Sequence, residues 1–254
     1  MNKNRQFLHK LKDFKLTEPE SKKEYNEILF SPVSRVYSII TILLSFGRDK
    51  SWKRRLIRML PLVSAPRVID LACGPGDICF LIARKYKMAR VIGVDLNQGM
   101  LEKAEENLKK SYPRFRNRIT FKKGDMNHLE YVDSSFDVLT GSYALRNAPD
   151  LGSTLDEIRR VLKPGGTAAF LDFSKSHLVL LQKIQLSLLS FWGRLWGLVF
   201  HGNAEVYGYI AESLKEFPDA RAFSRLVETK GFKIKGKQSF FFGLLCITVA
   251  EKIS

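Results

Sequence analysis

The chain has 254 residues, of which 45% are hydrophobic and 27% charged, a balance that excludes a largely disordered protein and is typical of one large globular domain with room for a helical appendage. Its formal net charge of +16 is compatible with nucleic acid, an anionic membrane surface or an acidic substrate, and does not choose among them. Three scattered cysteines exclude a disulfide framework and a zinc cluster.

The first 60 residues are predicted to form an N-terminal arm and a helical cap. Residues 1–23 are polar and basic without periodicity, which is typical of a loosely held arm, and they lack the apolar core of a signal peptide. We therefore expect a cytoplasmic protein. Apolar residues then recur at helical spacing over residues 24–45, with an interruption near Ser31-Pro32 that predicts two helices.

A third helix is predicted over Ser51–Leu60, ending before Pro61. It carries a run of basic residues at Lys53, Arg54, Arg55 and Arg58. Such a run is typical of a solvated helix face, and it is also compatible with contact to anionic lipid headgroups.

Residues 61–254 alternate strand and helix patterns, which predicts a doubly wound α/β fold with a mostly parallel sheet. A closing pair of strands, turned at residues 241–243, brings the sheet to seven strands. The predicted strands cover 67–72, 90–95, 119–123, 136–141, 167–173, 233–240 and 244–250. The predicted helices cover 77–87, 98–110, 151–162 and 220–230, and the turn Pro164-Gly165-Gly166 leads into the fifth strand.

An unusual apolar stretch lies between His177 and Phe200, within an insertion of about residues 177–215. Its length approaches a membrane span, but Gln182, Lys183 and Arg194 interrupt it, so a transmembrane helix is not expected. Two interpretations stay open: a buried helix of the domain, or an apolar lid or interfacial helix for a lipid-like substrate.

A glycine turn follows the first predicted strand, in the pattern Asp70, Gly74, Gly76. Glycines allow backbone N–H groups to approach a ligand closely beside a helix N-terminus, which favours a nucleotide-like group. The third glycine of a dinucleotide loop is absent. An ordinary strand-to-helix turn is the competing interpretation.

Carboxylates end the next two strands, where ligands bind in open α/β sheets. Asp95 lies about 20 residues after the glycine turn and is placed to accept hydrogen bonds from ribose hydroxyls, although it could instead cap the following helix. Asp125, followed by Met126, is placed to accept from an exocyclic amine such as that of adenine. A solvated turn is the alternative for Asp125.

The fourth strand ends in Gly-Ser-Tyr-Ala-Leu-Arg-Asn. Ser142 is a candidate cofactor contact, and Arg146 and Asn147 offer a cation and an amide to a substrate oxygen. The competing interpretation is that Arg146 pairs with a surface acid. The histidines show no metal-like spacing, so no metal site is predicted; His128, His201 and Asp172 are weak candidates for a proton acceptor.

These motifs together resemble the class I S-adenosylmethionine-dependent methyltransferases, which have a Rossmann-like sheet. Within that class, the chain is similar to the ubiquinone/menaquinone biosynthesis C-methyltransferase family. The shared motifs are Asp70-Leu-Ala-Cys-Gly-Pro-Gly-Asp77, Gly93-Val-Asp-Leu96, Gly124-Asp125, Leu145-Arg-Asn147, Arg160-Val-Leu-Lys-Pro-Gly-Gly166, Asp172-Phe-Ser-Lys175, Tyr37 with Gly47 and Trp52-Lys53, and Tyr209-Ile-Ala-Glu-Ser-Leu-Lys-Glu-Phe-Pro218. The chain departs from the family at Pro75, where a Thr is usual, and at Ser38, where an Asp is usual.

The resemblance implies methyl transfer from S-adenosylmethionine to a ring carbon of a prenylated quinol, with a demethylmenaquinol-type acceptor favoured. It implies that Arg146 and Asn147 are catalytic and that the apolar stretch covers the polyprenyl tail. The expected partners are a lipophilic small molecule and, through the basic surface, an anionic membrane; a homodimer is left open, and nucleic acid is not expected. The alternatives are an N- or O-methyltransferase of another lipid, such as a phospholipid amine, and more distantly an RNA methyltransferase or nucleic-acid binder.

Overall fold

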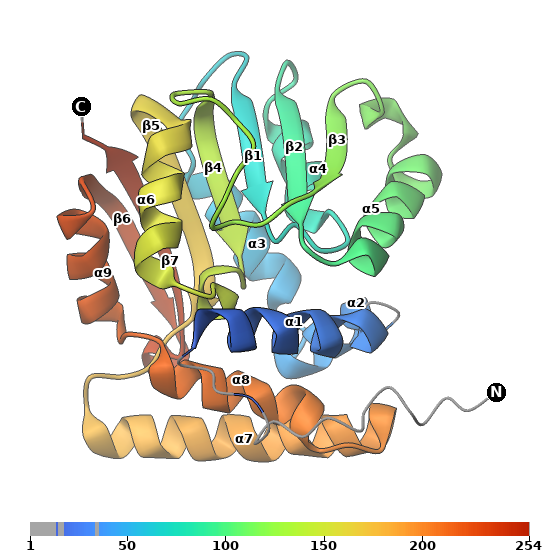
Figure 1. Cartoon of the computed structure of the whole chain (residues 1–254), viewed down its shortest axis with the longest axis vertical. Coiled ribbons are helices and arrows are strands. Elements are labelled where there is room, and N and C mark those ends of the chain that lie inside the picture. Colours follow the sequence, from blue (N-terminus) through green and yellow to red (C-terminus); the bar gives the residue numbers. More distant parts are fainter. Residues whose placement is uncertain (1–13, 15–17, 34–35, 254) are drawn as a thin grey trace.

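The computed structural model describes residues 14, 18–33 and 36–253, and its centre is one seven-stranded sheet (Figure 1). The strand order is β3-β2-β1-β4-β5-β7-β6, in which β7 runs antiparallel to both of its neighbours, β5 and β6, and all other neighbouring strands are parallel. This is the doubly wound, mostly parallel seven-stranded sheet predicted from the sequence. The strands are β1 (Arg67–Leu71), β2 (Arg90–Asp95), β3 (Ile119–Lys123), β4 (Phe136–Ser142), β5 (Leu162–Phe173), β6 (Phe232–Phe240) and β7 (Leu245–Lys252).

Helices cover both faces of the sheet, and a separate buried cluster lies beneath each layer. One layer contains α3 (Asp49–Met59), α4 (Asp77–Lys85) and α5 (Gln98–Ser111); the other contains α6 (Leu151–Val161) and α9 (Ala220–Thr229). The central strands bury side chains on both faces, as parallel strands between two helical layers do. Short 3₁₀ turns are η3 (Pro113–Phe115), η4 (Leu145–Asn147) and η5 (Phe241–Gly243).

Four further helices gather at the edge of the sheet where the parallel strands end. In Figure 1, α1 and α2 lie just below the strand ends, and α8 and α7 form the layers beneath them. These helices are α1 (Pro19–Val33), α2 (Tyr37–Leu44), α7 (Val179–His201) and α8 (Glu205–Glu216). This arrangement encloses the strand ends, where the sequence places the candidate site residues.

The helix α1 begins earlier than the sequence predicts. It starts at Pro19, inside the predicted arm 1–23, and it passes through Ser31 and Pro32 before ending at Val33. Pro19 is compatible with this start, because proline is favoured in the first turn of a helix. The first turns are also held by a contact with a distant part of the chain, in which Lys22 Nζ donates to the carbonyl oxygen of Ala148 at 2.6 Å. The rest of the predicted arm lies almost entirely outside the described residues.

Two other elements differ from the prediction. The strand β5 begins at Leu162, so the predicted turn at residues 164–166 lies within its first part. The sequence does not predict α8 as a separate helix, because Gly208 lowers the local helix propensity of this segment. Packing against α7 and the core overrides this weak local propensity, since most of α8 is buried.

The pairing of α7 with α8 is unusually close. A Cβ placed on Gly193 would lie 2.5 Å from the carbonyl oxygen of Tyr207, and one on Gly197 would lie 2.5 Å from that of Asn203. Only glycine permits this approach of the two backbones. The two glycines therefore fix which face of α7 is turned toward α8.

No helix within the described parts of the chain is long and apolar enough to span a bilayer. The division into a cap of residues 1–60 and a methyltransferase domain of residues 61–254 with an insertion stays a prediction. The helix α3, assigned to the cap from the sequence, packs against α4 and β5.

Candidate active site

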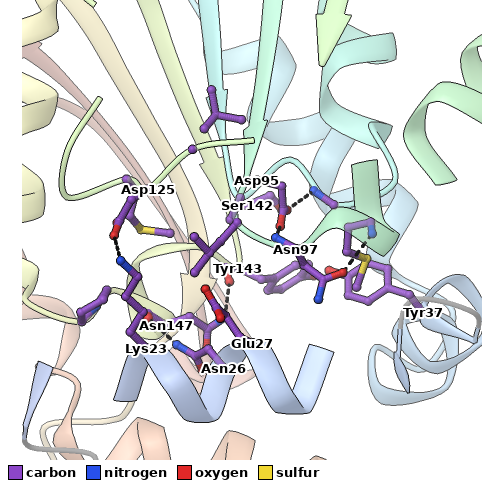
Figure 2. A pocket seen from close by; sticks show the side chains of 18 residues that line it. Lys23, Asn26, Glu27, Tyr37, Asp95, Asn97, Asp125, Ser142, Tyr143 and Asn147 are labelled. Atoms are coloured by element: carbon purple, nitrogen blue, oxygen red, sulfur yellow. Dashed lines mark hydrogen bonds and ion pairs between the residues drawn. The ribbon is translucent and has the colours of Figure 1, made fainter. Parts of the chain in front are cut away.

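A cavity opens at the carboxyl ends of β1 to β4, with α1 across its mouth (Figure 2); its empty space, open solvent included, is about 800 Å³. Five residues predicted to bind a cofactor line it together: Gly74, Asp95, Asp125, Met126 and Ser142. Asp70 and Gly76, also predicted, do not line it. Figure 2 shows residues from α1 and from the strand ends converging on this cavity.

The glycine turn forms one wall through Gly74, whose backbone N–H donates to Asp95 Oδ2 at 2.8 Å. Gly76 has a φ of +88° and caps α4, and a Cβ on it would lie 2.8 Å from the ring of Phe121. The side chain of Pro75 is buried outside the cavity lining, and its carbonyl oxygen accepts from Asn107 Nδ2 at 3.0 Å. Proline has no backbone N–H to donate. Because Pro75 does not line the cavity, this missing donor leaves no gap in the cavity wall.

Asp95 presents a carboxylate at the end of β2. It accepts hydrogen bonds from the backbone N–H groups of Gly74 and, at 2.9 Å, of Asn97. Burial raises the pKa of Asp95, and these hydrogen bonds oppose the rise. It does not cap α5, because Asn97 fills that position and its Oδ1 accepts from the Met100 N–H at 3.1 Å. Asp95 therefore remains available to a ligand with hydroxyl donors.

Asp70 lies behind the turn, fully buried in the sheet. It accepts from Thr140 Oγ1 at 2.6 Å and from Cys79 Sγ at 3.4 Å, and burial raises its pKa from the usual 3.8 to about 7. A neutral carboxyl in this position satisfies its neighbours without a buried charge. Through these two bonds Asp70 joins β1 to β4 and to α4.

We expect this carboxyl to make stability depend on pH. A carboxyl with a raised pKa in the folded state contributes stability that is complete below pH 3.8 and is lost as pH rises to about 7. The isosteric Asp70→Asn variant has no carboxyl to ionise at this position, so it does not lose this stability as pH rises. The melting temperature of the variant minus that of the wild type should therefore increase between pH 4 and about 7 and stay constant above that. Thermal unfolding of both proteins over this range measures the difference, and a difference independent of pH would contradict the assignment.

Asp125 is held by α1. Lys23 Nζ lies 2.6 Å from Asp125 Oδ2, and this hydrogen bond raises the pKa of Lys23. From the same helix Asn26 and Glu27 also line the cavity (Figure 2). The sequence does not predict these three residues of α1 at the site, because the segment shows little apolar periodicity and falls in part within the expected arm.

A second cavity of about 670 Å³ adjoins the first and is predominantly apolar. Its walls come from α1, α2, η4 and α8, with Leu29, Val33, Ile40, Leu44 and Ile210 among them. Both cavities are lined by Tyr37, Tyr143 and Asn147, which mark their junction. The apolar stretch of α7, expected to cover a substrate tail, lines neither cavity; α8 takes that place and α7 lies behind it.

Arg146 contributes the cation of the second cavity, and it is 4% exposed. Its backbone N–H donates to Asp172 Oδ2 at 3.1 Å, and its Nη1 donates to Ser213 Oγ. Its Nε lies 3.9 Å from Asp172 Oδ1 and has no hydrogen-bond partner within the described chain. Arg146 thus pairs with an acid, as the competing interpretation held, but that acid is buried, and one guanidinium donor remains unsatisfied.

Asn147 is fixed between the cavities. Its side-chain Nδ2 donates to the backbone carbonyl oxygen of Tyr143 at 3.0 Å, and its backbone carbonyl oxygen accepts from Asn26 Nδ2 at 2.8 Å. Its buried Oδ1, like Ser142 Oγ, lacks a partner in the described structure. Buried polar atoms are nearly always paired, so these atoms mark places where a ligand would complete the hydrogen bonding.

An ionic group supports the junction from the side of α3; Lys53 and Asp49 in it are buried, and Asp77 is partly exposed. Lys53 Nζ lies 2.8 Å from both Asp49 Oδ2 and Asp77 Oδ2, and Tyr143 donates to Asp49 Oδ1 at 3.0 Å. The helix α3 thereby positions the Tyr143 ring. None of the three candidate proton acceptors, His128, His201 and Asp172, lines either cavity.

A doubly wound sheet in this strand order, with a cavity at its carboxyl edge that the carboxylates Asp95 and Asp125 line, is the architecture of the class I methyltransferase fold. An S-adenosylmethionine-dependent methyltransferase from Mesorhizobium loti shares the fold, with a TM-score of 0.57 and 18% identity over 80% of this chain and 98% of that one. The ubiE/COQ5 methyltransferase family matches residues 18–252, and the chain belongs to this family. It is therefore a methyltransferase.

Two relatives span nearly the whole chain. The demethylmenaquinone methyltransferase of Desulfitobacterium hafniense (strain Y51) is 28% identical over 92% of both chains. The ubiquinone/menaquinone biosynthesis C-methyltransferase UbiE of Geobacter sulfurreducens is 31% identical over 96% of this chain and 93% of that protein. The family predicted from the sequence motifs is thus confirmed.

Proposed function

We propose that this enzyme transfers a methyl group from S-adenosylmethionine to a ring carbon of a prenylated quinol, with a demethylmenaquinol-type naphthoquinol as the favoured acceptor. The observation that carries the proposal is the meeting, at Tyr37, Tyr143 and Asn147, of a cavity that Asp95 and Asp125 line with a second cavity whose lining is almost entirely apolar apart from Arg146. The names of the two relatives, a demethylmenaquinone methyltransferase and a quinone biosynthesis C-methyltransferase, support the acceptor class.

The first cavity fits S-adenosylmethionine. Asp95 offers a carboxylate to the ribose hydroxyls, the open backbone at Gly74 allows close approach, and Ser142 Oγ is buried without a partner among the described residues. Asp125 and Met126 line the part of the cavity assigned to adenine. When bound, S-adenosylmethionine supplies an electrophilic methyl group on a sulfonium.

The second cavity fits the acceptor. Arg146, through its unsatisfied Nε, stabilises negative charge on a quinol oxygen, which makes the adjacent ring carbon nucleophilic. Asn147 lines both cavities and orients the ring at their junction. The ring carbon forms its bond to the methyl group as the sulfur–methyl bond breaks, and the ring proton leaves to water. The apolar wall from α1, α2 and α8 holds the start of the tail.

The same proposal includes the enzyme's location. A prenylated quinol partitions into the bilayer, so we place the enzyme in the cytoplasm, peripherally at the inner face of the membrane. Its net charge of +16 favours an anionic surface.

An acceptor comparison tests the proposed function. Purified enzyme is incubated with labelled S-adenosylmethionine and membrane extract of a quinone-deficient strain, and lipid products are separated from nucleic acid. We expect label in a quinol with one added methyl group. Label found in phospholipid amines or in RNA would instead support the alternative methyltransferases and contradict the proposal.

A further inference from the structure

The outer face of α7 carries a continuous stripe of exposed apolar side chains. Six residues at spacings of three and four, and therefore on one side of the helix, are each between 39% and 74% exposed: Leu180, Ile184, Leu188, Phe191, Leu195 and Leu198. Soluble monomers rarely expose so many large apolar groups together. We call these six residues the α7 stripe.

The stripe cannot turn inward. Gly193 and Gly197 hold the opposite face of α7 within backbone contact of the α8 region, where even a Cβ would clash. Gln185 and Leu189, on that same face, are buried. In Figure 1, α7 forms the outermost layer at this end of the molecule. The exposure of the stripe is therefore built into the packing of the two helices.

Neighbouring elements extend the apolar surface. The exposed ring of Phe46, after α2, stacks on Trp192 of α7 at a centroid distance of 5.3 Å. Gln185 Nε2 donates to the carbonyl oxygens of Phe241 and Phe242 at 3.3 and 3.1 Å, which ties η5 to α7. Phe242 is 87% exposed. The surface thus carries aromatic side chains from three separate parts of the chain.

The charges around the α7 stripe indicate which kind of partner covers it. No acidic residue occurs between Phe173 and Ala204, whereas Lys183 and Arg194 are exposed along one flank of the stripe. Arg48 and Lys50 are likewise exposed close to Phe46. A second copy of this chain would bring like charges together, while an anionic bilayer offers the complementary charge and an apolar interior.

The surface also adjoins the second cavity. Helix α2 lines that cavity with Ile40 and Leu44, and the opposite side chains Ile39 and Ile42 are exposed. Trp192 Nε1 donates to the carbonyl oxygen of Leu43 at 3.2 Å, which joins α2 to α7. A tail bound in the cavity is therefore separated from the surface by a single helix.

We propose that the α7 stripe, with Phe46 and the η5 tip, is the surface by which the protein docks on an anionic lipid bilayer, with α7 lying in the plane of the interface. The choice of a lipid partner is consistent with the proposed function and rests on it in part. The geometry and charge of the surface do not depend on the identity of the acceptor.

Vesicle binding by full-length variants tests the proposal. The Leu188→Ser/Phe191→Ser variant should bind vesicles of phosphatidylcholine and phosphatidylglycerol at least ~10-fold more weakly than the wild type. The Lys183→Gln/Arg194→Gln variant should lose about 5-fold in affinity per charge removed for these anionic vesicles, because each cation contributes through electrostatic attraction. Its affinity for vesicles of phosphatidylcholine alone should match that of the wild type. The matched control is Leu62→Ser/Val132→Ser, which removes two exposed apolar side chains at the opposite edge of the sheet and should bind normally.

Activity on a short-tailed, water-soluble quinol separates the two proposals. The serine variant should retain the wild-type rate, since its substituted residues line neither cavity. Failure of the wild type itself to methylate the quinol counts against the proposed function while the vesicle data stand. Equal vesicle binding by the serine variant and the wild type overturns the docking surface. So does a wild-type dimer in sedimentation velocity that the same variant dissociates, since the occupant is then a second copy.

Discussion

Replacing Arg146 by alanine is expected to lower kcat by about 10²- to 10³-fold, the usual effect of removing one group that stabilises a developing oxyanion. Arg146 lines the acceptor cavity and not the first cavity, so the Kd for S-adenosylmethionine should remain close to that of the wild type. Single-turnover kinetics measure the first effect, and calorimetric titration measures the second. Loss of donor binding would count against the assignment.

The same substitution leaves the buried carboxylate of Asp172 without its cation, which typically costs about 3–5 kcal/mol of stability. The double variant Arg146→Ala/Asp172→Asn separates stability from catalysis, because it removes the unpaired charge but does not restore the cation. We expect it to recover most of the lost stability and none of the lost turnover. Recovery of turnover would show that Arg146 acts only through folding.

Replacing Asp95 by alanine should raise the Kd for S-adenosylmethionine by about 100-fold or more, since it would remove the two charged hydrogen bonds that we propose to the ribose hydroxyls, each contributing roughly 1.5–3 kcal/mol. It also frees the N–H groups of Gly74 and Asn97 that Asp95 now holds. Turnover at saturating donor should fall much less. Equilibrium dialysis and kinetics at varied donor concentration measure both quantities.

Asp125→Asn is the matched control for that prediction. Asp125 follows the end of β3 and lines the same cavity. Like Asp95, it has a donor on each carboxylate oxygen, Lys23 on one and the N–H of Asn127 at 2.9 Å on the other, and asparagine keeps one of these two acceptors. We expect a loss of about 10-fold or less, typical of a single weakened hydrogen bond. If Asp95→Ala binds the donor no worse than Asp125→Asn, then Asp95 does not hold the ribose.

Local sequence patterns predict most of the sheet, because strand periodicity and glycine turns are determined within a few residues. The same locality explains why Asp95 and Asp125 line one cavity: the carboxyl ends of parallel strands meet at a single edge. Asp70 belongs to the same motif but points into the sheet, a difference of side-chain direction that spacing along the motif does not reveal.

Contacts between distant segments account for what the sequence could not predict. Asn26 reaches the site only because α1 crosses the strand ends, where it bonds both Asn147 and Tyr209, at separations of more than 100 residues. The apolar composition of α7 is compatible with a buried helix and with a lid or interfacial helix, and the glycine contacts with α8 turn its apolar stripe away from the cavity. Composition alone could not distinguish a helix that lines a cavity from one that faces outward.

The most direct test of the central claim is the position of the transferred methyl group. Purified enzyme is incubated with S-adenosylmethionine carrying a ¹³C-labelled methyl and with demethylmenaquinol in anionic vesicles, and the extracted product is examined by NMR. We predict a single labelled methyl bonded to a ring carbon. A labelled methyl on a quinol oxygen, or no label in the quinol when lipid amines become labelled, would contradict this assignment.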